Sequence, residues 1–183
     1  MSKSHQTSYI LRPIDPADAE RLASHYERLS SESRLRRFLS PKPRLTAREL
    51  AFLTDVDHVR HEALAAVDDA DGSIVGTARY VAEPARTGVA DVAVDVVDEL
   101  QNQGIGTALA HGVIDRAREN GFAMLTATTL WENRPALALL RRLGFRSRGS
   151  HRGEIEFELA LDRAAGGRGR MPVSSPAGPG GPR

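Results

Sequence analysis

The feature that most constrains this chain is a strand pattern that leads into a glycine-containing helix start. In residues 91–96 aspartate or alanine alternates with valine, a period of two that predicts a β-strand over residues 89–97. The segment Gln101-Asn102-Gln103-Gly104-Ile105-Gly106-Thr107 follows it. Residues 104–119 then carry apolar side chains at helical spacing. This order places the N-terminus of a helix beside the end of a strand.

Gly104 and Gly106 indicate what this turn can bind. Without a Cβ, glycine lets backbone N–H groups approach a ligand closely. A helix start also presents unpaired N–H groups and the positive end of the helix dipole, which together bind phosphate. A diphosphate would therefore lie at the helix start, with an extended arm along the preceding strand. The two glycines alone fit a ligand-free tight turn equally well.

Two other glycine-rich motifs do not match. A dinucleotide-binding fingerprint requires a third glycine where this chain has Leu109. A P-loop requires a lysine followed by serine or threonine, whereas Gly106 is followed directly by Thr107.

The remaining patterns predict one α/β domain over residues 9–162. Asp15-Pro16 is typical of a helix start, and Thr46 with Glu49 forms a capping-box pattern. Further strands are expected at residues 9–12, 61–67, 73–81, 122–130, 145–148 and 154–161. Further helices are expected from Asp15 through Leu29 and at residues 33–38, 46–53 and 133–143.

The two ends differ from this domain in composition. Residues 163–183 are rich in Gly, Pro and Ser, so we expect a disordered tail, and residues 1–8 a flexible N-terminus. The tail holds four Arg and no acidic residue. Subtracting these from the net charge of +1 leaves −3 for residues 1–162. A mildly acidic domain argues against nucleic-acid binding.

Composition also limits the chemistry. The chain has no cysteine, which excludes disulfides, Cys-ligated zinc and a cysteine nucleophile. Its six His are dispersed; His58 and His61 would form at most a pair with no third ligand, so no metal is expected. The N-terminus lacks a signal-peptide pattern, and no apolar run is long enough for a membrane span. We therefore expect a cytoplasmic protein without a membrane partner.

A second motif follows one strand after the first. It reads Asn133-Arg-Pro-Ala-Leu-Ala-Leu-Leu-Arg-Arg-Leu-Gly-Phe145. Together the two motifs resemble the acetyl-CoA-binding motifs of GNAT N-acetyltransferases, and the order of elements agrees from Tyr9 to Asp162. The resemblance implies the GNAT fold, an α/β (α+β) architecture with a central, mixed, mostly antiparallel twisted sheet of six to seven strands and helices on both faces.

A finer resemblance lies in the N-terminal part. Leu11-Arg-Pro-Ile14, Leu29-Ser-Ser-Glu-Ser-Arg34 and Arg37-Phe38 are similar to the catalytic domain of bacterial protein lysine acetyltransferases. The same signatures occur in stand-alone members of the superfamily whose substrates are unassigned.

The resemblance implies roles for named residues. Backbone groups of Val94, Asp95 and Val96 would pair with the pantetheine arm of acetyl-CoA, which is the co-substrate. The loop and helix start would bind the cofactor through Gln101, Asn102, Gln103, Gly104, Ile105, Gly106 and Thr107, with residues 103–107 around the diphosphate. Asn133 would contact the pantetheine, cap its own helix, or do both.

Transfer of an acetyl group to an amine needs a base, because a free lysine side chain, with a pKa of about 10.4, is protonated at neutral pH. Asp91 is the candidate, and it stands where the lysine-acetyltransferase branch carries a glutamate. As an aspartate is shorter, a water relay is expected. The alternatives are that Asp91 or Asp95 caps a bulge or pairs with an arginine such as Arg79, and that Asp95 or Glu83 is the base.

The other residues considered for the site each allow a functional and a structural interpretation. The superfamily often protonates the leaving thiolate with a tyrosine; here Leu140 stands at that position, and it also fits core packing. Trp131 would line the acceptor cleft or pack as an ordinary aromatic. Arg141 and Arg142 would approach the cofactor 3′-phosphate or be solvated helix charges.

We therefore expect an N-acetyltransferase whose acceptor is an amine, either a protein lysine or a small molecule. An acetyl-CoA-binding sensor without activity is the alternative of a different class. The acceptor pocket would come from residues 30–61 and the strand ends, and the protein would be a monomer or homodimer.

Overall fold

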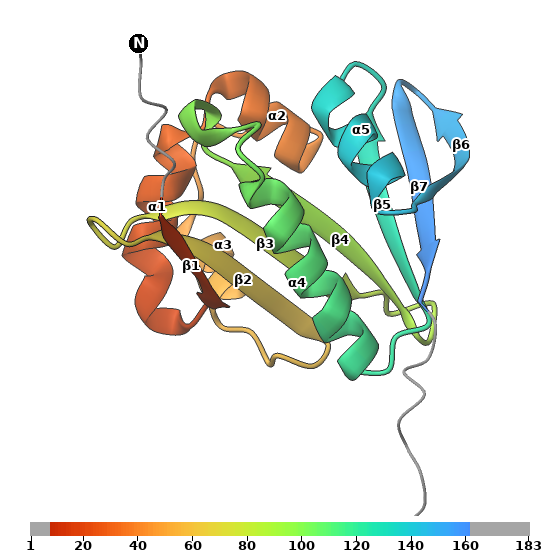
Figure 1. Cartoon of the computed structure of the whole chain (residues 1–183), viewed down its shortest axis with the longest axis horizontal. Helices are drawn as coiled ribbons and strands as arrows, with labels where there is room; N and C mark the ends of the chain where they lie inside the picture. Colours follow the sequence, from red (N-terminus) through yellow and green to blue (C-terminus); the bar gives the residue numbers. More distant parts are fainter. Residues whose placement is uncertain (1–7, 162–183) are drawn as a thin grey trace, which may run out of the picture.

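The computed structural model describes residues 8–161, which form seven strands and five helices of two turns or more (Figure 1). The strands are β1 (Tyr9–Pro13), β2 (His61–Asp68), β3 (Ile74–Ala82), β4 (Val89–Val96), β5 (Met124–Leu130), β6 (Arg146–His151) and β7 (Glu154–Ala160). The helices are α1 (Ala19–Arg28), α2 (Ser31–Phe38), α3 (Ala47–Thr54), α4 (Ile105–Glu119) and α5 (Arg134–Arg142). Apart from Ser8, both expected tails lie outside the described residues.

The capping residues that the sequence predicts stand at the helix starts in the structure. Asp15 accepts a hydrogen bond from the N–H of Ala17 at 2.8 Å, ahead of a short 3-10 turn that leads into α1. Thr46 and Glu49 form a reciprocal capping box at the start of α3. These caps satisfy N–H groups that have no partner within the helix. No helix within residues 8–161 is long and apolar enough to cross a membrane.

The strands form one sheet in the order β1-β2-β3-β4-β5-β7-β6. All neighbours are antiparallel except β4 and β5, which are parallel. The predicted mixed, mostly antiparallel sheet of six to seven strands with flanking helices is thereby confirmed.

The parallel pair is short, and this opens the sheet. Pairing between β4 and β5 covers three residue pairs and ends at Asp91 with Thr126. Beyond that point the two strands diverge toward α2 and α5 (Figure 1). Residues 92–96 therefore pair with β3 along one edge and have no strand partner along the other within residues 8–161. Their backbone N–H and C=O groups on that edge are available to a ligand.

The helices divide between the two faces of the sheet. Helix α4 crosses β2, β3 and β4 on one face, with α5 on the same side over β5 and β7 (Figure 1). Val92, Val96 and Leu109 belong to the larger apolar core on this side. A smaller core, which includes Leu22 and Leu53, packs α1 and α3 against the opposite face. The odd-numbered residues of β4 point to this second face.

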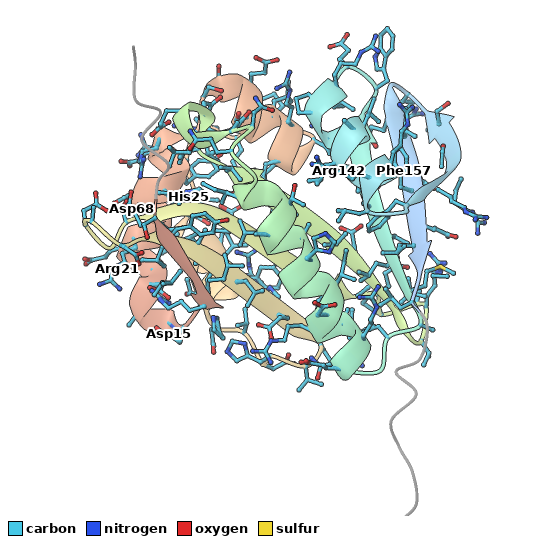
Figure 2. All side chains as sticks on the ribbon, in the orientation of Figure 1. Asp15, Arg21, His25, Asp68, Arg142 and Phe157 are labelled. Atoms are coloured by element: carbon cyan, nitrogen blue, oxygen red, sulfur yellow. The ribbon has the colours of Figure 1, made fainter. Side chains whose placement is uncertain are left out.

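Asp95 lies at the centre of a polar cluster on the second face. Its Oδ1 is 2.5 Å from His25 Nε2, and its Oδ2 accepts hydrogen bonds from Arg37 Nε and Thr77 Oγ1, each at 2.9 Å. His25 lies between α1 and the sheet (Figure 2) and also contacts the carbonyl oxygen of Ile74 at 3.1 Å. This one carboxylate therefore ties α1, α2 and β3 to β4.

The surroundings of Asp95 stabilise its charged form. Burial alone would raise its pKa, but the hydrogen bond and charge of His25, followed by the charge of Arg37, outweigh burial and hold the pKa well below its usual range. The alternative that Asp95 pairs with an arginine is confirmed, but the arginine is not Arg79. The partner is Arg37, because the Arg79 side chain runs toward α3, where its Nη1 donates to the carbonyl oxygen of Leu53.

Replacing Asp95 by Asn should destabilise the fold by about 3–5 kcal/mol at pH 7, since it removes the counter-charge of Arg37 and the carboxylate that contacts the buried His25. Because the pKa is lowered on folding, the advantage of the wild type is present above the unfolded-state pKa of about 4 and shrinks as the pH falls below it. Urea unfolding of both proteins at pH 7, 4 and 3 measures this. A difference that stays constant down to pH 3 would contradict the assignment.

Glu99→Gln is the matched control for this measurement. Glu99 also forms an ion pair with an arginine of α1, with 2.7 Å between Arg28 Nη2 and Glu99 Oε1, but both side chains are exposed. The change should therefore alter stability by less than about 1 kcal/mol at any of these pH values.

Candidate active site

The divergence of β4 and β5 creates a cavity of about 370 Å³. Its floor is formed by residues 92–96 and by residues 127–129 of β5, and its sides by the start of α4, by α5 and by Ser33, Arg36 and Arg37 of α2. The cavity thus lies where the sheet is open, between helices from both faces. We call it the groove.

Most residues that the sequence predicts for the cofactor line this groove. They are Val94, Asp95, Val96, Gln101, Asn102, Gly104, Gly106, Thr107 and Asn133. Gln103 and Ile105 do not line it. The amide of Gln103 turns back to the carbonyl oxygen of Glu99 at 3.4 Å, and Ile105 is buried in the core beneath α4. Any contribution of these two residues would come from their backbone N–H groups.

The start of α4 has the geometry of an anion site. Gly104 has a φ of +90°, which other residues rarely adopt, and a Cβ built on it would meet nothing within 4 Å. The first intrahelical bond of α4 is donated by Ala108 to the carbonyl oxygen of Gly104 at 3.0 Å. The N–H groups of residues 105–107 consequently have no acceptor within the helix and face the groove end.

Arg142 adds a positive charge at this end of the groove. It projects from α5 toward the gap between α5 and α4 (Figure 2), and its Nη2 donates to Thr107 Oγ1 at 2.9 Å. Arg142 lines the groove, whereas Arg141 does not. Of the two arginines, only Arg142 is therefore positioned to meet a phosphate.

The middle of the groove contains two polar groups suited to an amide-rich arm. Asn133 is buried, and its Oδ1 accepts from the N–H of Ala136 at 3.3 Å, so the helix-capping role is present. Thr129 is 3% exposed, and its hydroxyl has no hydrogen-bond partner within residues 8–161. A buried hydroxyl without a partner is costly, and a pantetheine amide in the groove would satisfy it. The residues present thus fit coenzyme A.

A second cavity, of about 290 Å³, adjoins the groove on the opposite face of the sheet, and we call it the side cavity. Arg37 and Ala93 line both cavities. The other residues of the side cavity are Phe38, Lys42, Leu45, Glu49, Phe52, Leu53, Arg79, Val81 and Asp91. Residues 30–61 and the strand ends, which the sequence predicts to form the acceptor pocket, thus line a cavity; that an acceptor binds there stays a prediction.

Asp91 lines the side cavity at the last residue pair before the strands diverge. The residue is exposed to solvent. Its carboxylate nevertheless lies in a concave wall, where loss of water raises its pKa. The nearby charge of Glu83 acts in the same direction, and a hydrogen bond from Thr126 opposes it. An aspartate with a raised pKa is a better general base near neutral pH.

Thr126 is a residue that the sequence did not single out. Its hydroxyl lies 2.9 Å from Glu83 Oε1 and 3.2 Å from Asp91 Oδ1, and so connects two of the three carboxylates that the sequence offers as bases. Only the register of β4 against β5 shows this, because residue 126 is far from both in the chain.

The remaining candidate residues have no contact within residues 8–161 that indicates a catalytic role. Leu140 is 9% exposed and packs in the core, as the packing interpretation predicts, and the groove therefore has no tyrosine at this position. Trp131 is 59% exposed and lines neither cavity. His58 contacts the carboxylate of Glu62 at 2.7 Å, while His61 stacks on Phe52.

Fold and site together fit an acyltransferase that uses a coenzyme A thioester. The model of the acetyltransferase (GNAT) family matches residues 24–145. The chain therefore belongs to the GNAT acetyltransferase family, and with it to the acetyl-CoA-dependent acyltransferases.

Individual relatives agree with this assignment. Acetyltransferase PA5475 of Pseudomonas aeruginosa is 33% identical over 138 residues, which are 74% of each protein. Acetyltransferase Pat of Mycolicibacterium smegmatis is 33% identical over 136 residues, and the chain spans only 40% of its length. The crystal structure of the GNAT domain of S. lividans PAT superposes with a TM-score of 0.77 at 30% identity, covering 88% of this chain and 100% of that domain.

Filling the groove end should block the cofactor. Gly104→Leu places a side chain where the diphosphate is expected, and we expect acetyl-CoA affinity to fall at least about tenfold. Gly121→Leu is the matched control, since Gly121 also has a positive φ (+78°) and open space around it but lies at the far end of α4. Calorimetric titration of both variants with acetyl-CoA tests this. Equal affinities in the two variants would refute the assignment.

The unpartnered hydroxyl of Thr129 gives a second test. Thr129→Val keeps the shape, so the stability of the free protein should not fall, while acetyl-CoA affinity should fall about three- to tenfold. Thr54→Val is the control: Thr54 is equally buried but donates to the carbonyl oxygen of Leu50 at 2.8 Å. That variant should lose about 1 kcal/mol of stability and keep its affinity. The reverse pattern would place Thr129 outside the cofactor site.

Proposed function

We propose that this protein transfers the acetyl group of acetyl-CoA to an amine in the side cavity, by direct attack and with Asp91 as the general base. The acceptor is a small amine or a lysine side chain of a protein. The observation that supports the proposal is that Arg37 and Ala93 line both cavities, while Asp91 lines the side cavity.

The two cavities suit the two substrates. A thioester whose diphosphate lies at the start of α4 would bring its acyl end along the open edge of β4 toward the side cavity. The acceptor would enter from the other face, where the mouth of the cavity carries Asp91. Such an arrangement brings both reactants together without an acetylated enzyme as an intermediate.

In the reaction, Asp91 takes a proton from the ammonium of the acceptor, directly or through one water molecule. The amine nitrogen then attacks the thioester carbonyl carbon and forms the C–N bond. Backbone N–H groups on the open edge of β4 would stabilise the oxyanion of the tetrahedral intermediate. Its collapse breaks the C–S bond. The acetylated nitrogen then loses its second proton, and the thiolate takes one up; both transfers run through water, because Leu140 cannot donate a proton.

Replacing Asp91 by Asn should lower kcat about 10²- to 10⁴-fold while acetyl-CoA affinity stays within about twofold. In the wild type, activity should rise with pH as Asp91 loses its proton, and because its pKa is raised this limb lies above the usual range of an aspartate. Release of free thiol, followed against pH, measures both effects. Normal turnover by Asp91→Asn would show that another group is the base.

The variant Glu83→Gln distinguishes the role of Glu83 from that of Asp91. If Glu83 only raises the pKa of Asp91 through its charge, the variant should keep its maximal rate, and its rising limb should move to lower pH. A loss of rate as large as that of Asp91→Asn would instead make Glu83 the base.

A further inference from the structure

Arg79 is a buried cation in the side cavity that no carboxylate of residues 8–161 contacts. The residue is 4% exposed and lines the cavity from β3. No acidic side chain lies within 4 Å of it in residues 8–161. Burying a charge without a counter-charge costs free energy, so such a position calls for an explanation.

The neighbours of Arg79 leave its charge intact. Its Nη1 donates to the carbonyl oxygen of Leu53 at 3.0 Å and lies 3.3 Å from His61 Nε2. Its Nε has no partner within the described residues. Burial, with repulsion from Arg79, lowers the pKa of His61 to about 4, so this histidine is neutral and supplies no negative charge. Burial, with repulsion from Arg37, lowers the pKa of Arg79 to about 9 against the attraction of Asp95, which makes no contact with it, and Arg79 stays protonated at neutral pH.

The other charges of the side cavity are already paired, with one exception. Arg37 is bound to Asp95 of the polar cluster, and Lys42 is bound to Glu49. The lining is thus left with one cation and one carboxylate without an ionic partner in the described part of the chain, namely Arg79 and Asp91. A ligand that balances both must itself carry a positive and a negative group.

We propose that the acceptor is an amine that also carries a carboxylate: Arg79 binds the carboxylate, while the amino group faces Asp91. This inference rests on the proposed function and names its substrate class. The guanidinium of arginine offers paired N–H donors that match the two oxygens of a carboxylate, and the Nε of Arg79 is one such donor without a partner.

The sheet register places the two groups on the same side. Arg79 pairs with Ala93 and Val81 pairs with Asp91, so Arg79 and Asp91 are diagonal neighbours on adjacent strands. Side chains related in this way share one face of the sheet and start roughly 7–8 Å apart. Both line a cavity whose volume suits a compact ligand or one entering side chain. A carboxylate-bearing amine therefore meets both charges within one cavity.

The test compares acceptors that differ only in charge. Acetyl-CoA and the wild-type protein are combined with the common L-amino acids, with their α-carboxamides, and with peptides in which a lysine adjoins either Glu or Gln. Thiol release is measured in each case. We expect kcat/KM for the best acceptor to exceed that of its uncharged amide about ten- to a hundredfold, as for a hydrogen-bonded charge pair. Free amino acids and peptides distinguish the two sources of the carboxylate.

Arg79→Met should abolish this preference by lowering kcat/KM for the acid to that of the amide and leaving the amide unchanged. A purely structural role, in which Arg79 only holds the end of α3, would lower both equally and overturn the proposal. Arg34→Met is the matched control, because Arg34 also donates to main-chain oxygens, those of Pro43 and Glu27, but lines neither cavity. It should keep the preference of the wild type.

Further measurements keep the proposal falsifiable if Arg79→Met does not fold. Arg79→Lys retains the charge but not the paired donors, and it should keep only part of the preference. In the wild type, the acetylated acid should inhibit more strongly than the acetylated amide. Equal rates with acids and amides would reject the carboxylate proposal and leave the acetyltransferase standing. Binding of acetyl-CoA without thiol release from any amine would reject the proposed function and this inference with it.

Discussion

The short pairing between β4 and β5 is the constraint on which the rest of the structure depends. Two parallel strands joined over only three residue pairs leave one edge of β4 without a partner, and unpaired backbone in a sheet interior has to be satisfied from elsewhere. The opening also lets side chains from the two faces of the sheet meet at one place. Without it, the start of α4 and the side cavity would lie on opposite sides of a continuous barrier.

Because side chains alternate along β4, one face of the strand packs in the core and the other carries its carboxylates. Its valines face α4 and form the apolar wall beneath the groove, whereas Asp91 and Asp95 face the other side. The two aspartates nevertheless differ in character. Asp95 is enclosed by His25, Arg37 and Thr77 and stays ionised, so it holds the helices of His25 and Arg37 against β4. Asp91 lines a cavity and is exposed, so it can gain and lose a proton.

Much of the fold and of the groove could be predicted from the sequence, because the signals are local. Strand alternation, the capping box at Thr46 and the glycines before α4 each act within a few residues. The side cavity could not be predicted in the same way. The pairing of Asp95 with Arg37, the contact of Thr126 with Asp91 and the isolation of Arg79 all depend on which distant residues the sheet register brings together, and one sequence carries no direct signal for this.

Gly76 shows how closely function depends on that register. It pairs with Val96 beneath α4, and a Cβ there would lie 2.9 Å from Leu109 Cδ1 and 3.0 Å from the carbonyl oxygen of Asp95. If β3 shifted by one residue, a residue with a side chain would take this place, and a strand that slips by one turns every side chain to the other face. Such a slip in β4 would bury the aspartates under α4 and turn the valines toward the acceptor. Misaligned molecules would thus be unstable as well as inactive. The close packing of α4 on Gly76 therefore favours the native register over a shifted one.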